Sequence, residues 1–113
     1  MKTKYSDKPF AKALAPILQD KYGDNLGRYT LSEFLLELKS KTGFSEEYLR
    51  LMLRDRRPLV IPEVPEAAAQ ILGLDPHYFK EYRLWWVESM IQEHPDLMVR
   101  VYEVTRAFAE EKS

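Results

Sequence analysis

The stretch from Thr30 to Pro58, TLSEFLLELKSKTGFSEEYLRLMLRDRRP, holds two amphipathic helix patterns joined by a glycine. The first pattern begins at Thr30, which can cap a helix. Glu33 lies three residues later, where its carboxylate can accept a hydrogen bond from the backbone N–H of the cap. Apolar residues at i, i+3, i+4 and i+7 form one face of this helix: Leu31, Phe34, Leu35 and Leu38. Gly43 then ends the helix, because glycine adopts a positive φ without steric cost.

The second pattern begins at Ser45, which we expect to cap the next helix. Phe44 precedes this cap and Leu49 stands at the fourth helical position, the spacing of a hydrophobic staple. Two helices joined by a turn of about three to four residues that contains glycine form a helix-turn-helix. The stretch therefore indicates nucleic-acid binding.

The composition of the chain is that of a globular protein. It has 113 residues, of which 45% are hydrophobic and 12% aromatic, enough for a real core. No apolar run approaches the roughly 18 residues of a membrane span, and the N-terminus MKTKYSDKPF lacks a signal-type segment. Without cysteine, disulfides and thiolate metal sites are excluded. We expect a cytoplasmic protein that does not contact a membrane.

The charges are distributed unevenly along the chain, although the net charge is only −1. Residues 1–57 carry 12 Lys and Arg against 8 Asp and Glu, whereas residues 58–113 carry 5 against 10. Such asymmetry favours an anion-binding end and an end with another role, although chance can also produce it. The helix-turn-helix pattern lies in the positive half.

The segment before this stretch predicts one further helix and a loop. Asp7 can cap a helix whose apolar face is formed by Phe10, Leu14, Ile17 and Leu18. Pro16 interrupts this pattern, so the helix either bends there or begins near it. The segment Tyr22–Tyr29, YGDNLGRY, has the glycines, Asn and Asp of a loop.

Three more helices are expected after the stretch. Pro62 or Pro65 opens a short fourth helix with Val64, Ala67, Ala68 and Ile71 on its inner face, and Gly73 ends it. Asp75 and Pro76 suit the cap and first position of a fifth helix. Glu93-His94-Pro95 breaks that helix, and a last one runs from Pro95 to about Glu110. With no convincing strand, we predict an all-α fold.

The ordered set of patterns resembles the lambda-repressor-like, or Cro/C1-type, helix-turn-helix regulators. The similarity runs from about Phe10 to Tyr82. TGFSEEYLRLMLRDRRPL is similar to the turn, recognition helix and following loop of that family, and ILGLDPHYF to its passage from the fourth to the fifth helix. The resemblance implies a five-helix DNA-binding domain at residues 8–82, with a recognition helix at about 45–55 that lies in the major groove. Residues 83–113 would then be a helical extension that serves dimerisation.

The chain departs from the family pattern at several positions. The usual Gln near the start of the second helix is replaced by the run Thr30-Leu31-Ser32-Glu33. The distance from Leu31 to Gly43 is about two residues longer than in the family, so either this helix or its entry differs. Glu46 and Glu47 stand where the base-contacting side chains of the family tend to lie. Carboxylates there can accept a hydrogen bond from cytosine N4, but they repel phosphates, and they also favour a helix N-terminus without any DNA.

Nine residues are candidates for DNA contact: Thr30, Ser32, Ser45, Glu46, Glu47, Arg50, Arg54, Arg56 and Arg57. Arg50 is the best candidate for a base edge, because a guanidinium can bind guanine O6 and N7 together. Its alternative role is an ion pair with a glutamate one turn earlier. Arg54, Arg56 and Arg57 suit phosphate contacts or a solvated loop. Thr30 and Ser32 can donate to phosphate or simply cap a helix.

Aromatic residues cluster near the fifth helix, at Tyr78, Phe79, Tyr82, Trp85 and Trp86. A stacking platform for bases is one interpretation, but the helical spacing favours a core or a dimer interface. His77 and His94 are too few and too far apart for a metal site. No Ser or Lys has the context of a nucleophile, so we expect no enzyme activity, cofactor or metal.

We therefore expect a DNA-binding transcriptional regulator that acts as a homodimer on double-stranded DNA. Two-fold pairing places two recognition helices about one DNA turn apart. The self-association surface is expected on the last two helices, at Trp85, Leu97, Val101, Val104 and Phe108. The alternative is a protein-interaction module or adaptor that keeps the fold without binding DNA. A continuous positive surface on the recognition helix favours DNA, whereas a mixed surface favours protein.

Overall fold

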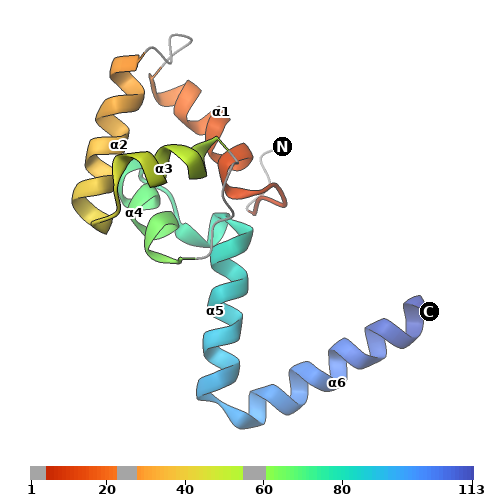
Figure 1. Ribbon diagram of the computed structural model, residues 1–113. Coiled ribbons are helices and arrows are strands. Elements are labelled where there is room, and N and C mark those ends of the chain that lie inside the picture. Colours follow the sequence, from red (N-terminus) through yellow and green to blue (C-terminus); the bar gives the residue numbers. More distant parts are fainter. Residues whose placement is uncertain (1–4, 23–27, 55–60) are drawn as a thin grey trace. The chain divides into compact units, whose positions relative to one another are not determined.

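The computed structural model describes residues 5–22, 28–54 and 61–113, and it describes the side chains of all of these except 22 and 28–32. Helices are the only regular elements in this part of the chain (Figure 1). They are α1 (Phe10–Tyr22), α2 (Arg28–Thr42), α3 (Glu46–Leu53), α4 (Glu63–Leu72), the 3₁₀ turn η1 (Pro76–Tyr78), α5 (Lys80–Glu93) and α6 (Pro95–Lys112). The described chain is thus all-α, as predicted.

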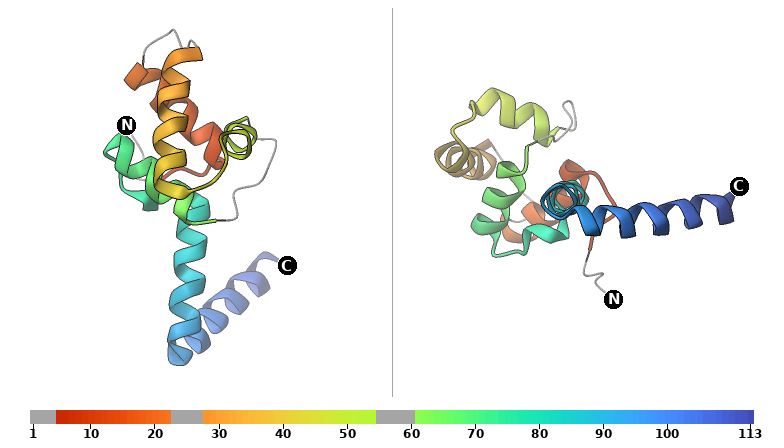
Figure 2. Two further views of the ribbon diagram at one scale, coloured as in Figure 1. Left: turned by 60° about the vertical axis from the view of Figure 1, so that its left-hand side comes forward. Right: turned by 90° about the horizontal axis from the view of Figure 1, so that it is seen from below.

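The chain divides into two compact units, Met1–Arg83 and Leu84–Ser113, and the division falls within α5. In the first unit α2 packs against both α3 and α4, and α1 packs against α3 (Figure 2). None of the helices described is long and apolar enough to cross a membrane.

Helix α1 includes Pro16 without interruption, so the alternative that the helix begins near this proline is wrong. Apolar side chains on both sides of Pro16 are buried in the core, among them Leu14 and Leu18. Their burial offsets the hydrogen bond that a proline cannot donate.

The N-terminus of α1 differs from the prediction that Asp7 caps it. The helix begins at Phe10, and the carbonyl of Pro9 accepts its first hydrogen bond, from Ala13 N at 2.8 Å. The N–H of Phe10 donates to the carboxylate of Glu81, which comes from α5. Asp7 is therefore not the N-cap of α1, and the backbone of Phe10 is reached by Glu81, a residue distant in sequence.

Helix α2 starts earlier than predicted. It begins at Arg28, so Thr30 lies inside the first turn and the predicted cap at Thr30 is wrong. The predicted loop at 22–29 is correspondingly too long at both ends, and residues 23–27 lie outside the described part. The end of α2 agrees with the prediction, because Gly43 follows Thr42 with φ 80 and donates to Lys39 O at 2.8 Å.

Helix α4 begins after Pro62 and ends at Gly73, which has φ 68. Asp75 does cap the next turn, since its Oδ1 accepts from His77 N at 2.9 Å. That turn is the separate 3₁₀ element η1, and α5 begins only at Lys80. The prediction of one continuous fifth helix from Pro76 is therefore wrong. The break at His94 and the start of α6 at Pro95 agree with the sequence, and α6 continues two residues beyond the predicted end.

The core of the first unit draws on every one of its helices. Its fully buried large side chains include Leu14 from α1, Phe34 and Leu38 from α2, and Leu49 from α3. Phe79 completes it, and its ring lies edge-on to that of Phe10 with the centroids 4.8 Å apart. α3 is thus held against α1 and α2 by its own apolar side, and its other side remains at the surface.

Candidate nucleic-acid interface

The connection between α2 and α3 is a tight turn with its polar groups satisfied. Thr42 Oγ1 donates to Leu38 O at 2.7 Å and accepts from Phe44 N at 3.3 Å. Gly43 takes the left-handed conformation between them. Three residues, 43–45, therefore join the two helices, which is the connection expected of a helix-turn-helix.

Ser45 is the N-cap of α3. Its backbone is extended, and its Oγ accepts a hydrogen bond from Tyr48 N at 3.2 Å. Such a cap satisfies one of the N–H groups that a helix start leaves without an intrahelical acceptor. The hydroxyl can still donate one hydrogen bond, so capping and a phosphate contact are compatible at this residue.

Apolar side chains form the inward side of α3. Leu49 and Met52 are 1% and 2% exposed, and Tyr48 and Leu53 pack partly against the core. Phe44 directs its ring toward Tyr48, with the centroids 5.4 Å apart. The buried positions fix the rotation of α3, so the remaining side chains of its first two turns face solvent.

The outward side of α3 carries four charged residues that the sequence offered as candidates for DNA contact: Glu46, Glu47, Arg50 and Arg54. Arg50 Nη2 lies 3.3 Å from Glu46 Oε1, one helical turn earlier. Both side chains remain about two-fifths exposed, 42% for Arg50 and 39% for Glu46. The ion pair that we considered as the alternative role of Arg50 is therefore present in the free protein.

The charge on this surface is mixed. The described residues of the α3 surface contribute two carboxylates and two guanidiniums, a balance rather than a continuous positive area. Arg54, the residue after the helix, is exposed, and its backbone N–H closes the last turn by donating to Arg50 O at 3.1 Å. Arg56 and Arg57 lie outside the described residues.

Thr30 and Ser32 lie in the first two turns of α2, and their side chains are outside the described part. Because α2 begins at Arg28, Ser32 is the fifth residue of the helix. Its backbone N–H is therefore in a position to bond within the helix rather than to a phosphate. The predicted place of Ser32 at the helix N-terminus is therefore wrong, whereas a phosphate contact by its hydroxyl stays a prediction.

The aromatic cluster is partly core. Phe79 is fully buried, and Tyr82 is 8% exposed. The hydroxyl of Tyr82 donates to Glu66 Oε1 at 2.9 Å. Burial and this carboxylate raise the pKa of Tyr82 to about 12. These two rings are unavailable for stacking on bases, whereas Trp85 and Trp86 are 38% and 43% exposed.

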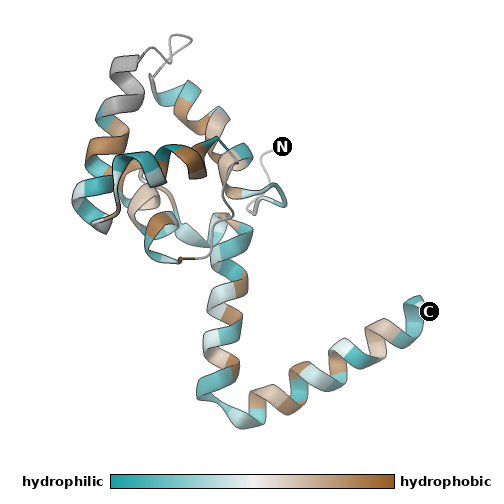
Figure 3. Cartoon of the chain, in the orientation of Figure 1, coloured by the Kyte–Doolittle hydropathy of each residue, from teal (hydrophilic) through white to brown (hydrophobic). Residues whose placement is uncertain are grey.

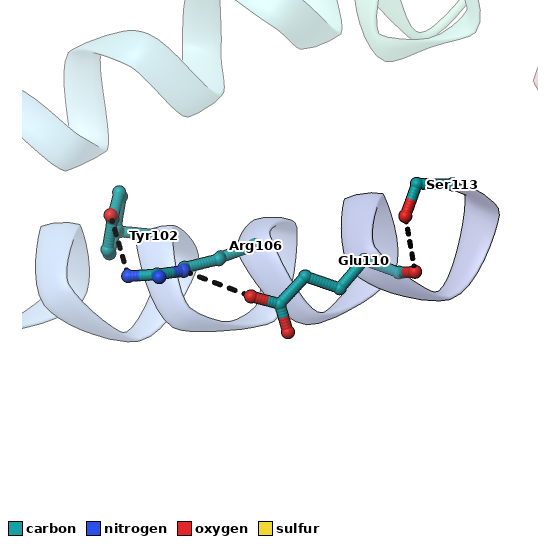
Figure 4. A network of polar contacts seen from close by, with 4 residues as sticks. All are labelled: Tyr102, Arg106, Glu110 and Ser113. Carbon is teal, nitrogen blue, oxygen red and sulfur yellow. Dashed lines mark hydrogen bonds and ion pairs between the residues drawn. The ribbon is translucent and has the colours of Figure 1, made fainter.

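Helix α6 carries the apolar stripe predicted for dimerisation, which consists of Leu97, Val101, Val104 and Phe108. No residue of α6 is buried, and Figure 3 shows hydrophobic residues recurring along it. A polar network follows the helix at a different set of positions (Figure 4): Arg106 Nε donates to Glu110 Oε1 at 3.2 Å, and its Nη1 lies 3.5 Å from Tyr102 Oη. At 3.6 residues per turn, this network lies opposite the apolar stripe.

Arg83 is a supporting residue that the sequence did not indicate. Its Nη1 donates to His77 O at 2.9 Å and Tyr78 O at 2.8 Å, and its Nη2 donates to Ser6 O at 2.7 Å. These bonds hold the N-terminal segment against the start of α5. Backbone carbonyls are the acceptors, so no side-chain pattern in the sequence could have revealed the cluster.

Comparisons with models of protein families, with curated proteins and with solved structures found no match to this chain.

Proposed function

We propose that this protein is a sequence-specific DNA-binding transcriptional regulator, with a lambda-repressor-like domain at residues 8–82 and with α3 as its recognition helix. One observation carries the proposal: α2 and α3 are joined by a capped three-residue turn, and two arginines lie on the side of α3 that faces away from the core. A helix supported in this way can enter the major groove with its outer side chains toward the bases.

The contacts would be divided between bases and backbone. Arg50, one turn into α3, is placed to contact a base edge, as a guanidinium does at guanine. Arg54, together with Arg56 and Arg57 in the sequence that follows, would contact phosphates and fix the position of the protein on the duplex. Ser45 would add a hydroxyl at the start of the helix.

A homodimer is part of this proposal. In α6 the exposed fractions of Val104 and Phe108 are 70% and 60%, large values for apolar side chains. A second copy of the same stripe would remove this surface from water, at roughly 25 cal/mol per Å² of apolar area before the costs of association. Two-fold symmetry then requires the same stripe on both subunits, and it matches a palindromic DNA site.

The test is a selection of bound sequences from random duplex DNA with the full-length chain, followed by affinity measurements at two salt concentrations. The selection should enrich a sequence with two related half-sites. The affinity should fall as the salt concentration rises, because phosphate contacts release counterions. Binding with no preferred sequence would contradict sequence-specific regulation.

The mixed charge of the α3 surface favours a second candidate, a protein-interaction module. Glu46 and Glu47 would repel phosphates, and they balance the two described arginines. For this candidate the same selection yields no bound duplex at low salt, where electrostatic attraction to DNA is strongest.

A further inference from the structure

Glu46 and Arg50 form a preassembled pair on the exposed side of α3. The two residues are four apart, and the single ion pair, at 3.3 Å, involves Nη2 of Arg50 and Oε1 of Glu46. A guanidinium has five N–H donors and a carboxylate has several acceptor sites, so one contact between them leaves most of both groups available. The pair therefore presents donors and an acceptor side by side.

The contribution of this pair to stability is small. Exposed i,i+4 ion pairs gain little from Coulomb attraction, because water screens both charges. The pair nevertheless restricts the orientation of a flexible arginine before any ligand is bound, which lowers the side-chain entropy lost when the arginine makes further hydrogen bonds.

The arrangement matches the edge of one base pair. In the major groove a G·C pair presents the acceptors N7 and O6 of guanine and then the N4 donor of cytosine. Guanidinium donors beside a carboxylate acceptor are complementary to that order. An A·T base pair presents an acceptor, a donor and an acceptor, followed by a methyl group. The side chains of Glu46 and Arg50 do not match this order.

We infer that Glu46 and Arg50 recognise one G·C base pair as a unit, with Arg50 donating to guanine and Glu46 accepting from cytosine N4. This inference rests on the proposed function, since it requires α3 to lie in the major groove. The carboxylate of Glu46, which would otherwise only repel DNA, then contributes to binding. The ion pair of Arg50 is with Glu46 and not with the exposed neighbour Glu47, so Glu47 is outside the proposed unit and provides a matched control.

The experiment uses the full chain and duplex DNA selected from a random library. The base pair contacted by Arg50 is identified as the position at which Arg50→Ala loses its preference. The cytosine of that pair is then replaced by N4-methylcytosine, which keeps Watson–Crick pairing and removes the N4–H that faces the major groove. Affinities are compared for the wild type, Glu46→Ala and Glu47→Ala.

The wild type and Glu47→Ala should both lose roughly tenfold in affinity on the methylated duplex, the scale of one good base contact. Glu46→Ala should lose less than about twofold, because it cannot make this hydrogen bond on either duplex. An equal loss of affinity in all three proteins, or no loss in the wild type, would overturn the recognition of a G·C base pair by Glu46 and Arg50. DNA binding itself would still stand. Failure to select any sequence overturns the proposed function itself, and this inference with it.

Discussion

The hydroxyl of Tyr82 in α5 donates a 2.9 Å hydrogen bond to Oε1 of Glu66 in α4. Tyr82 is 8% exposed, so the phenol is buried with its one polar atom satisfied, as buried tyrosines generally require. The bond joins two helices that both contribute to the core supporting α3.

Tyr82→Phe should lower the free energy of unfolding by about 1 kcal/mol, because it removes this bond and leaves a part-buried carboxylate oxygen without its donor. Denaturant unfolding of both proteins measures the difference. Glu66→Gln, which retains an acceptor oxygen, should cost less. An equal loss in the two variants would show that charge, rather than the hydrogen bond, stabilises this contact.

The same hydrogen bond makes the stability of the folded state depend on pH in the alkaline range. Burial, followed by the bond to Glu66, raises the pKa of Tyr82 from its ordinary 10.0 to about 12. The folded state therefore retains a proton that the unfolded chain loses, and this stabilisation is present below pH 10 and lost between about 10 and 12. Wild-type stability should fall more steeply in this window than that of Tyr82→Phe.

The burial of Glu81 makes stability depend on pH in the acidic to neutral range. Its Oε2 is buried and has no hydrogen-bond partner among the described residues, and desolvation by burial raises the pKa of this carboxyl. The protonated form is thus favoured by folding, so the stabilisation is present at low pH and is lost as pH rises through the raised pKa.

Glu81→Gln removes this titration. From about pH 4 to neutrality the wild type should lose stability relative to Glu81→Gln, as measured by chemical unfolding at several pH values. Glu37→Gln, at an exposed position of α2, is the control and should follow the wild type. A constant difference between wild type and Glu81→Gln across this range would refute the assignment.

The proposed dimer predicts that Val104→Asp shifts the chain toward monomers. The change places a charge in the apolar stripe, and a buried, unpaired carboxylate at a two-fold interface is strongly unfavourable. Sedimentation of the full-length chain at tens of micromolar measures the effect.

Val99→Asp is the matched control, because Val99 is 57% exposed and lies on the side of α6 that carries the polar network. It should leave the association unchanged. A wild-type chain that sediments as a monomer, or equal effects of the two variants, would contradict the predicted interface.

Local signals determined what the sequence could predict. Gly43, Ser45 and Gly73 each have a conformational or capping role that a single residue defines, and the structure has all three as expected. Leu49, placed by its spacing from Phe44, is buried on the inward side of α3. These features depend on neighbours within one or two turns, which is the range over which sequence patterns are informative.

Features that depend on distant residues were missed. The start of α1 lies beside Glu81, which is 71 positions away from Phe10, and a search for a nearby cap led to Asp7 instead. Pro16 remains in a helix because burial on both sides of it outweighs its local cost. The separation of η1 from α5 was also missed, since Asp75-Pro76 suits the start of either kind of helix.

Arg56 and Arg57 should bind phosphates of the DNA backbone. Changing both to Ala is expected to weaken binding to every duplex by a similar factor. It should also reduce the slope of log affinity against log salt by about one unit for each phosphate that is no longer neutralised. Titrations of selected and unrelated duplexes over a salt series give both quantities. Loss of preference at a single base position would instead assign these arginines to base recognition.

Base contact by α3 is tested most directly by the affinities of the full-length wild type and of Arg50→Ala for the duplex selected by the wild type. Arg50→Ala should bind this duplex more weakly by about 1–3 kcal/mol, lose preference at one base pair and unfold like the wild type. If Arg50→Ala keeps both the affinity and the base preference of the wild type, α3 does not contact the bases in the way proposed here.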